Sequence, residues 1–210
     1  MKTQTPTRIG ASPVAVSRDA RWRALGTRGL TIWITGLPAA GKSTIGAAVE
    51  ARLVQDGRAA CWLDGDRLRA GLNDDLGFDA ASRTESVRRT AQVAYLLADA
   101  GMITLVSLVS PYAEGRAQAR ALHERDGLAF FEVWVATPLI ECERRDPKGL
   151  YARARCGELC GMTGVDDPYE EPAAPDLELS GSLGIEQGVA SVLALIDRAC
   201  ASAGGVRAAS

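Results

Sequence analysis

Histidine is almost absent from this chain of 210 residues, which contains a single one, His123. The five cysteines are irregularly spaced, and the paired Cys and His spacings of structural zinc sites do not occur. No apolar run approaches the roughly 18 to 20 residues that a membrane-spanning helix requires. The net charge is -2 at pH 7, so there is no overall basic field to attract nucleic acid. These absences argue against a zinc-built domain, a membrane protein and a general nucleic-acid-binding protein.

The length and the 47% of hydrophobic residues suit a single domain with a sizeable core. We place that domain at residues 18–204. Residues 1–17 mix Thr, Pro, Ser and Gly without periodicity and are expected to be disordered, and residues 205–210 to be frayed. Because the polar N-terminal part lacks the apolar core of a secretory leader, we expect a cytoplasmic protein in which Cys156 and Cys160 stay reduced.

The segment GLPAAGKS at residues 36–43 matches the phosphate-binding pattern G-x-x-x-x-G-K-[ST]. It lies between an apolar, β-branched run and a helical pattern, which is the context that such a loop requires. Gly36 and Gly41 allow a tight turn whose N–H groups point inward, and the helix N-terminus adds partial positive charge. Lys42 would reach the β- and γ-phosphates of ATP, and Ser43 would be a ligand of Mg²⁺. The alternative is a glycine-rich turn that binds nothing. The predicted ATP-binding residues here are Gly36, Leu37, Pro38, Ala39, Ala40, Gly41, Lys42, Ser43 and Thr44.

Apolar runs alternate with amphipathic ones along the whole chain. We expect strands at residues 30–35, 58–63, 102–108, 129–136 and 176–179, the last at a sheet edge. We expect helices at residues 17–25, 42–55, 66–72, 83–100, 112–125 and 185–200, with short ones after Pro138 and within 149–159. Ser17 is expected to cap the first helix, and Ser82 the helix from residue 83, with Glu85 as its capping partner. This alternation predicts an α/β fold, a right-handed three-layer sandwich around a central parallel sheet that follows the phosphate-binding loop (P-loop) pattern.

Asp64 and Asp66 follow directly after the second expected strand. Open α/β sheets bind ligands at the carboxyl ends of their strands. These carboxylates would therefore lie beside the phosphate-binding loop if the first and second strands are neighbours. One could hold the water shell of Mg²⁺, and the other could accept the proton of an acceptor hydroxyl. The alternative is a plain Asp-Gly turn with Asp66 as a helix cap.

Residues after these aspartates suggest where a phosphate acceptor binds. Arg69, Phe78 and Arg83 could combine an aromatic face for a planar base with guanidinium groups for anionic oxygens. The alternative is a core aromatic residue and two solvated arginines.

Asp, Pro, Gly and paired arginines dominate residues 144–175, which is typical of a mobile functional segment, hereafter the lid. Its basic residues could close over the triphosphate and exclude water, and we expect Arg144 and Arg155 to bind ATP. The alternative is a charged loop that pairs with itself. The basic residues of the lid are Arg144, Arg145, Lys148, Arg153 and Arg155.

Six blocks of the sequence resemble the adenylyl-sulfate kinase family, in the family's order. They are GLPAAGKST (36–44), LDGDRLRAGL (63–72), DLGF (75–78), SLVSPY (107–112), CERRDPKGLY (142–151) and GMTGVDDPYE (161–170). The resemblance implies a kinase that moves the γ-phosphate of ATP, with Mg²⁺, to the ribose 3′-hydroxyl of adenosine 5′-phosphosulfate (APS). It also implies a homodimer, which is common among similar members.

The resemblance also implies roles for individual residues. Asp64 and Asp66 match the D-G-D pair near Mg²⁺ and the acceptor hydroxyl, with Asp64 as the expected general base. Ser110 matches the serine of the S-P-Y turn, which is phosphorylated during turnover in some members. The implied acceptor-binding residues are Arg69, Phe78, Arg83, Ser86, Lys148 and Met162, with Phe78 and Met162 on the two sides of the adenine.

The sequence departs from the family pattern mainly on the acceptor side. Ala70 stands where a histidine is usual, Ser86 where an asparagine is usual, and Met162 where a phenylalanine is usual. In the phosphate-binding loop, Pro38 and Ala39 replace Ser-Gly, although both required glycines are present. Two alternatives therefore stay open. One is a kinase of this fold that uses another hydroxyl-bearing acceptor, and the other is a nucleotide-binding partner without turnover.

Overall fold

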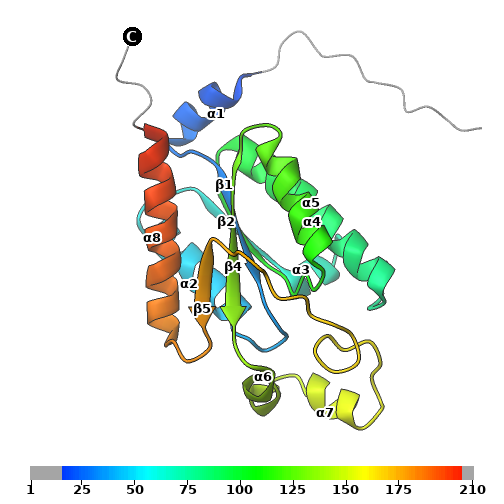
Figure 1. The fold of residues 1–210 in the computed structure, drawn as a ribbon. Helices are drawn as coiled ribbons and strands as arrows, with labels where there is room; N and C mark the ends of the chain where they lie inside the picture. Colours follow the sequence, from blue (N-terminus) through cyan, green and yellow to red (C-terminus); the bar gives the residue numbers. More distant parts are fainter. Residues whose placement is uncertain (1–15, 205–210) are drawn as a thin grey trace, which may run out of the picture.

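Five parallel strands form the centre of the molecule, in the order β2-β3-β1-β4-β5 (Figure 1). The structure is a computed structural model that describes residues 16–204. The expectations for residues 1–15 and 205–210 lie outside the described residues. The strands are β1 (Leu30–Thr35), β2 (Ala60–Asp64), β3 (Ile103–Ser107), β4 (Ala129–Ala136) and β5 (Leu177–Ser180). The helices are α1 (Arg18–Leu25), α2 (Lys42–Gln55), α3 (Gly65–Arg69), α4 (Ala80–Ala100), α5 (Ala113–Glu124), α6 (Leu139–Arg145), α7 (Leu150–Arg155) and α8 (Ile185–Gly204).

Helices cover both faces of the sheet, so the predicted three-layer α/β fold is confirmed. Helices α2 and α8 pack on one face, and α4 and α5 on the other (Figure 1). Helices α6 and α7 lie beyond the carboxyl ends of β4 and β5, at the bottom of Figure 1. These two helices therefore lie at the end of the sheet where parallel α/β sheets bind ligands.

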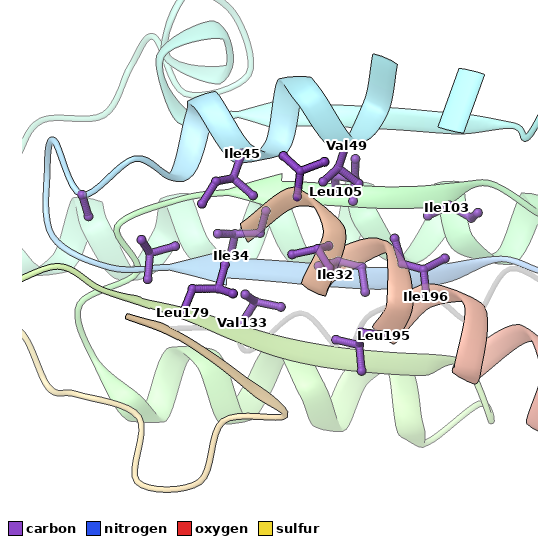
Figure 2. Close-up of a cluster of buried hydrophobic side chains, with 14 of the residues drawn as sticks. Ile32, Ile34, Ile45, Val49, Ile103, Leu105, Val133, Leu179, Leu195 and Ile196 are labelled. Carbon is purple, nitrogen blue, oxygen red and sulfur yellow. The ribbon is translucent and has the colours of Figure 1, made fainter. Parts of the chain in front are cut away.

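Strand β1 shows why the sheet is central. All six of its residues are buried, as expected of a continuous apolar run covered on both faces. Because alternate side chains point to opposite faces, Ile34 points into the buried cluster that also contains Ile45 of α2 and Ile196 of α8 (Figure 2). Trp33 points the other way, into the cluster beneath α4 and α5.

The beginning of α4 differs from the expectation. The helix starts at Ala80 and its N-cap is Asp79, whose carboxylate accepts a hydrogen bond from the backbone N–H of Ser82. Ser82 as the cap is therefore wrong, because an aspartate three residues earlier satisfies the same free N–H groups. Glu85 is not a capping partner and instead pairs with Arg88 at 2.7 Å.

The order of the strands decides the condition under which Asp64 and Asp66 are expected beside the loop. Strand β3 lies between β1 and β2 and pairs with both, so the first and second strands are not neighbours. Of the described residues, no helix is long and apolar enough to cross a lipid bilayer.

Candidate active site

A cavity of about 660 Å³ opens at the carboxyl end of the sheet. The ends of β2, β3, β4 and β5 contribute to its wall through Asp64, Ser107, Val135 and Leu179. The phosphate-binding loop and the start of α2 form another part of the wall, and the lid closes over it. One space therefore joins the loop to the residues predicted to bind the acceptor.

The phosphate-binding loop has the conformation that its glycines predict. Gly41 has φ +110°, and a Cβ on Gly36 would lie 2.8 Å from the carbonyl oxygen of Val135. Ala39 has φ 62°, a left-handed conformation that costs a non-glycine residue about 1–2 kcal/mol. The family pattern has a glycine at this position. Ala39 keeps the left-handed conformation that a glycine adopts easily, and the loop therefore keeps its shape.

Lys42 is held inside this loop. Its side chain is buried, and Nζ donates to the carbonyl oxygens of Gly36 at 2.9 Å and Leu37 at 2.7 Å. Burial lowers the pKa of Lys42 to about 8, because an ammonium group loses hydration there. The ammonium group of Lys42 is thus placed where the terminal phosphates of a nucleotide would replace these two carbonyl oxygens as hydrogen-bond acceptors.

Ser43, at the start of α2, meets Asp64, at the end of β2, although β3 separates β2 from β1. Ser43 Oγ donates to Asp64 Oδ2 at 2.6 Å. This contact forms because α2 packs tightly over β3. A Cβ on Gly46 would lie 2.5 Å from Ser107 Oγ, so only glycine allows this approach. Asp64 therefore lies beside the loop, although the condition attached to that placement, that the first and second strands are neighbours, is not met.

The two aspartates differ in their surroundings. Asp64 is buried and is the N-cap of α3, since its Oδ1 accepts from the N–H of Asp66 at 3.1 Å. The side chain of Asp66 is 66% exposed and forms an ion pair with Lys148 of the lid. Such an exposed pair contributes at most about 1 kcal/mol. The structure therefore offers one enclosed carboxylate and one at the mouth of the cavity.

Arg69 and Phe78 lie together on the acceptor side. The guanidinium carbon of Arg69 is 4.2 Å from the ring centroid of Phe78, and burial lowers the pKa of Arg69. Phe78 is 56% exposed, so the alternative of a core aromatic residue is wrong. The ring is instead available to a ligand.

Ser86 and Met162 complete this side of the cavity. Both are buried and line it. Ser86 Oγ accepts a hydrogen bond from the buried Asn73 at 3.0 Å, a neighbour that we did not predict. Arg83 also lines the cavity, and its Nε donates to the carbonyl oxygen of Phe78 at 2.8 Å.

Ser110 belongs to a buried polar network. Its hydroxyl accepts from Trp33 Nε1 at 3.1 Å and donates to Thr35 Oγ1 at 3.0 Å. Its backbone has φ 40°, and Arg116 donates to its carbonyl oxygen at 2.8 Å. Ser110 lines the cavity, and these contacts hold its hydroxyl against Trp33 and Thr35.

Sequence reasoning missed Arg116. This side chain is 3% exposed and pairs with Glu132 at 2.6 Å. A signal was present, because Arg116, Ala119 and His123 form the buried face of α5 at helical spacing. An arginine on a core-facing stripe indicates a buried ion pair.

The lid arginines divide into two groups. Arg145 lines the cavity, and its Nη1 donates to the carbonyl oxygen of Ala40 at 3.3 Å. Arg144 pairs with Glu141 at 2.7 Å and Arg155 with Glu143 at 2.5 Å. Neither of these two arginines is part of the cavity wall, so the structure puts Arg145, not Arg144 or Arg155, beside the loop.

Comparison with known proteins now identifies the family. The model of the Adenylylsulphate kinase family matches residues 28–180. The chain belongs to the adenylylsulphate kinase family. The matched range runs from just before β1 to the end of β5. It contains the phosphate-binding loop, both aspartates and the whole lid of this adenylylsulphate kinase homologue.

Individual relatives agree with the family match. The adenylyl-sulfate kinase of Geotalea uraniireducens is 47% identical over 180 residues, which cover 85% of this chain and 86% of that protein. The bifunctional enzyme CysN/CysC of Mycobacterium tuberculosis is 51% identical over 170 residues, 81% of this chain. The aligned part spans 28% of that enzyme's length.

A solved structure extends the similarity to three dimensions. The Mycobacterium tuberculosis APS kinase CysC in complex with AMPPNP and APS superposes with a TM-score of 0.79 at 51% identity, covering 81% of this chain and 99% of that one. The chain is thus similar in fold to an adenylylsulphate kinase that binds an ATP analogue.

Proposed function

We propose that this chain transfers the γ-phosphate of ATP to the ribose 3′-hydroxyl of APS, producing 3′-phosphoadenosine 5′-phosphosulfate. The observation that carries the proposal is the single cavity that joins Lys42, Ser43 and Asp64 to the exposed face of Phe78. Phosphoryl transfer requires the donor, the acceptor and a proton-accepting group in one enclosed site. The names of the relatives, and the two ligands of the Mycobacterium tuberculosis structure, support this choice of substrates.

The donor half would bind the phosphates of ATP. Lys42 and the N–H groups of the loop supply positive charge to them, and Arg145 adds a guanidinium group from the lid. Ser43 and Asp64 fit Mg²⁺, because their side-chain oxygens lie 2.6 Å apart beside the phosphate-binding loop and such hard oxygen ligands suit this ion. Ser43 would bind it directly and Asp64 through water, and the bound ion would neutralise phosphate charge.

Asp64 is the general base of this proposal. Its carboxylate is enclosed at the carboxyl end of β2 and lines the cavity. It would accept the proton of the 3′-hydroxyl as that oxygen attacks the γ-phosphate, a contribution of about 10²–10⁴ in rate. Asp66 would assist from the mouth of the cavity, where it pairs with Lys148 of the lid.

The acceptor half would hold APS by its base and its anionic end. Phe78 and Met162 present an aromatic face and a thioether to the adenine. Arg69, Arg83 and Lys148 would bind the phosphosulfate oxygens. Ser86 would replace the usual asparagine with a shorter hydroxyl.

The proposal is tested by measuring ADP release with purified protein, ATP, Mg²⁺ and a panel of acceptors. APS should be the preferred acceptor over AMP, adenosine and unrelated hydroxyl compounds. Preference for another hydroxyl compound would favour the kinase with a different acceptor. ATP binding without turnover on any acceptor would favour the inactive partner. A cytoplasmic location and a homodimer stay predictions from the sequence.

A further inference from the structure

The inner loop of the lid, residues 161–167, is organised around the carboxylate of Asp166. This carboxylate accepts hydrogen bonds from the backbone N–H groups of Gly161 at 2.7 Å and Met162 at 2.6 Å. The hydrogen bond from Gly161 is the main reason that the pKa of Asp166 lies below its usual value. The carbonyl oxygen of Met162 in turn accepts from Val165 N–H at 3.0 Å. The loop is therefore a closed turn that fixes the backbone on both sides of Met162.

Arg83 connects this turn to the opposite wall of the cavity. Its Nη2 donates to the carbonyl oxygen of Gly161 at 2.5 Å, and its Nε donates to that of Phe78 at 2.8 Å. Its side chain is 10% exposed and lies 3.6 Å from the carboxylate of Asp167. Two of the three guanidinium nitrogens are thus occupied in joining the residues before α4 to the residue before Met162.

The consequence concerns Phe78 and Met162, which line the same cavity from opposite segments. The distance between these two side chains depends on the backbone carbonyls of Phe78 and Gly161, which both accept hydrogen bonds from the guanidinium group of Arg83. The position of the Gly161 carbonyl depends on Asp166, because the carboxylate of Asp166 accepts hydrogen bonds from the N–H groups of Gly161 and Met162.

We propose that Asp166 is a positioning residue for the acceptor half of the site. By fixing the backbone of Gly161 and Met162, it aligns Arg83 and holds Met162 opposite Phe78. It acts through these residues without touching the substrate. The inference rests on the proposed function, since it assigns the effect to the binding of APS.

The test is steady-state kinetics of the full chain carrying Asp166→Asn. The amide keeps the size of the side chain but loses its charge and one of its two accepting oxygens. Hydrogen bonds to charged groups contribute about 1.5–3 kcal/mol, so KM for APS should rise about tenfold to a hundredfold. The KM for ATP should be unchanged, and kcat should change less than about threefold. A change limited to thermal stability, or an equal rise in both KM values, would overturn the inference.

Matched variants keep the test decisive. Glu158→Gln removes a lid carboxylate that faces Arg153 at 3.7 Å and is 65% exposed, and it should leave both KM values unchanged. Asp166→Glu keeps the charge and should restore part of the APS affinity that Asp166→Asn loses. If the asparagine variant does not fold, the KM values for APS and ATP are measured with the glutamate variant. In a cycle with Met162→Ala, the double variant should cost little more than the larger single change, whereas additive costs would contradict action through Met162.

The two proposals fail in different ways. Absence of APS turnover by the unmodified chain would refute the proposed function and this inference with it. Normal APS turnover by the unmodified chain, with an unchanged KM for APS in Asp166→Asn, would refute the inference alone.

Discussion

Replacing Asp64 with asparagine separates the catalytic role of this carboxylate from its structural one. The change removes one charge and keeps the shape of the side chain. In the structure the carboxylate accepts two hydrogen bonds, from Ser43 Oγ at 2.6 Å and from Asp66 N–H at 3.1 Å. An amide can keep one as acceptor and can donate to the serine oxygen in place of the other. We therefore expect a stability loss of only about 1–2 kcal/mol.

The expected loss of activity is much larger. An amide cannot accept the proton of the attacking hydroxyl, so kcat should fall by about 10²–10⁴, equivalent to about 3–5.5 kcal/mol in the barrier. The assay is ADP release at saturating ATP and APS, with thermal melting and ATP binding as checks of the fold. Asp66→Asn is the matched control on the same turn and should cost less than about tenfold, because that carboxylate is exposed. A kcat for Asp64→Asn within about threefold of the unmodified chain would exclude Asp64 as the general base.

Two further predictions concern the donor side, and a third concerns the packing of α2 on the sheet. Arg145→Ala should raise KM for ATP about tenfold, because it removes a charged hydrogen-bond donor from the cavity wall, while the exposed Arg144→Ala should change it less than about twofold; equal effects would contradict this assignment. Because burial lowers the pKa of Lys42 to about 8, the free protein loses this charge above that pH, and calorimetry should show ATP affinity falling by up to about tenfold per pH unit; Lys42→Arg should bind with no such fall. Gly46→Ala should destabilise the fold by about 1–3 kcal/mol in thermal melting, since its Cβ would lie 2.5 Å from Ser107 Oγ; an unchanged melting temperature would show that α2 can move away from the sheet.

Local patterns predicted much of this fold. The bounds of α2 and β4 match the expected ranges, and Ser17 caps α1 as expected. These elements depend on neighbouring residues, through periodicity and capping, which a sequence displays directly. The start of α4 was missed because two residues able to cap, Asp79 and Ser82, stand three positions apart. Either residue satisfies the sequence rule, and the structure shows that the carboxylate of the first one accepts the hydrogen bond.

The candidate site shows what local patterns leave out. The contact between Ser43 and Asp64 depends on how α2 crosses β3. That crossing is allowed by Gly46, which belongs to no recognisable sequence motif. The buried ion pair of Arg116 likewise joins α5 to β4, segments whose packing no short pattern encodes. The placement of the lid arginines also depends on packing. The orientation of α6 turns Arg145 toward the cavity and leaves Arg144 exposed.

In the proposed reaction, one cavity brings the γ-phosphate of ATP to a ribose hydroxyl of APS. Phosphorus NMR of the product, formed by the unmodified chain from ATP, APS and Mg²⁺, tests it most directly. We expect a new phosphomonoester signal that couples to the ribose proton at the 3′ position. A phosphate on any other position, or free phosphate alone, would contradict it.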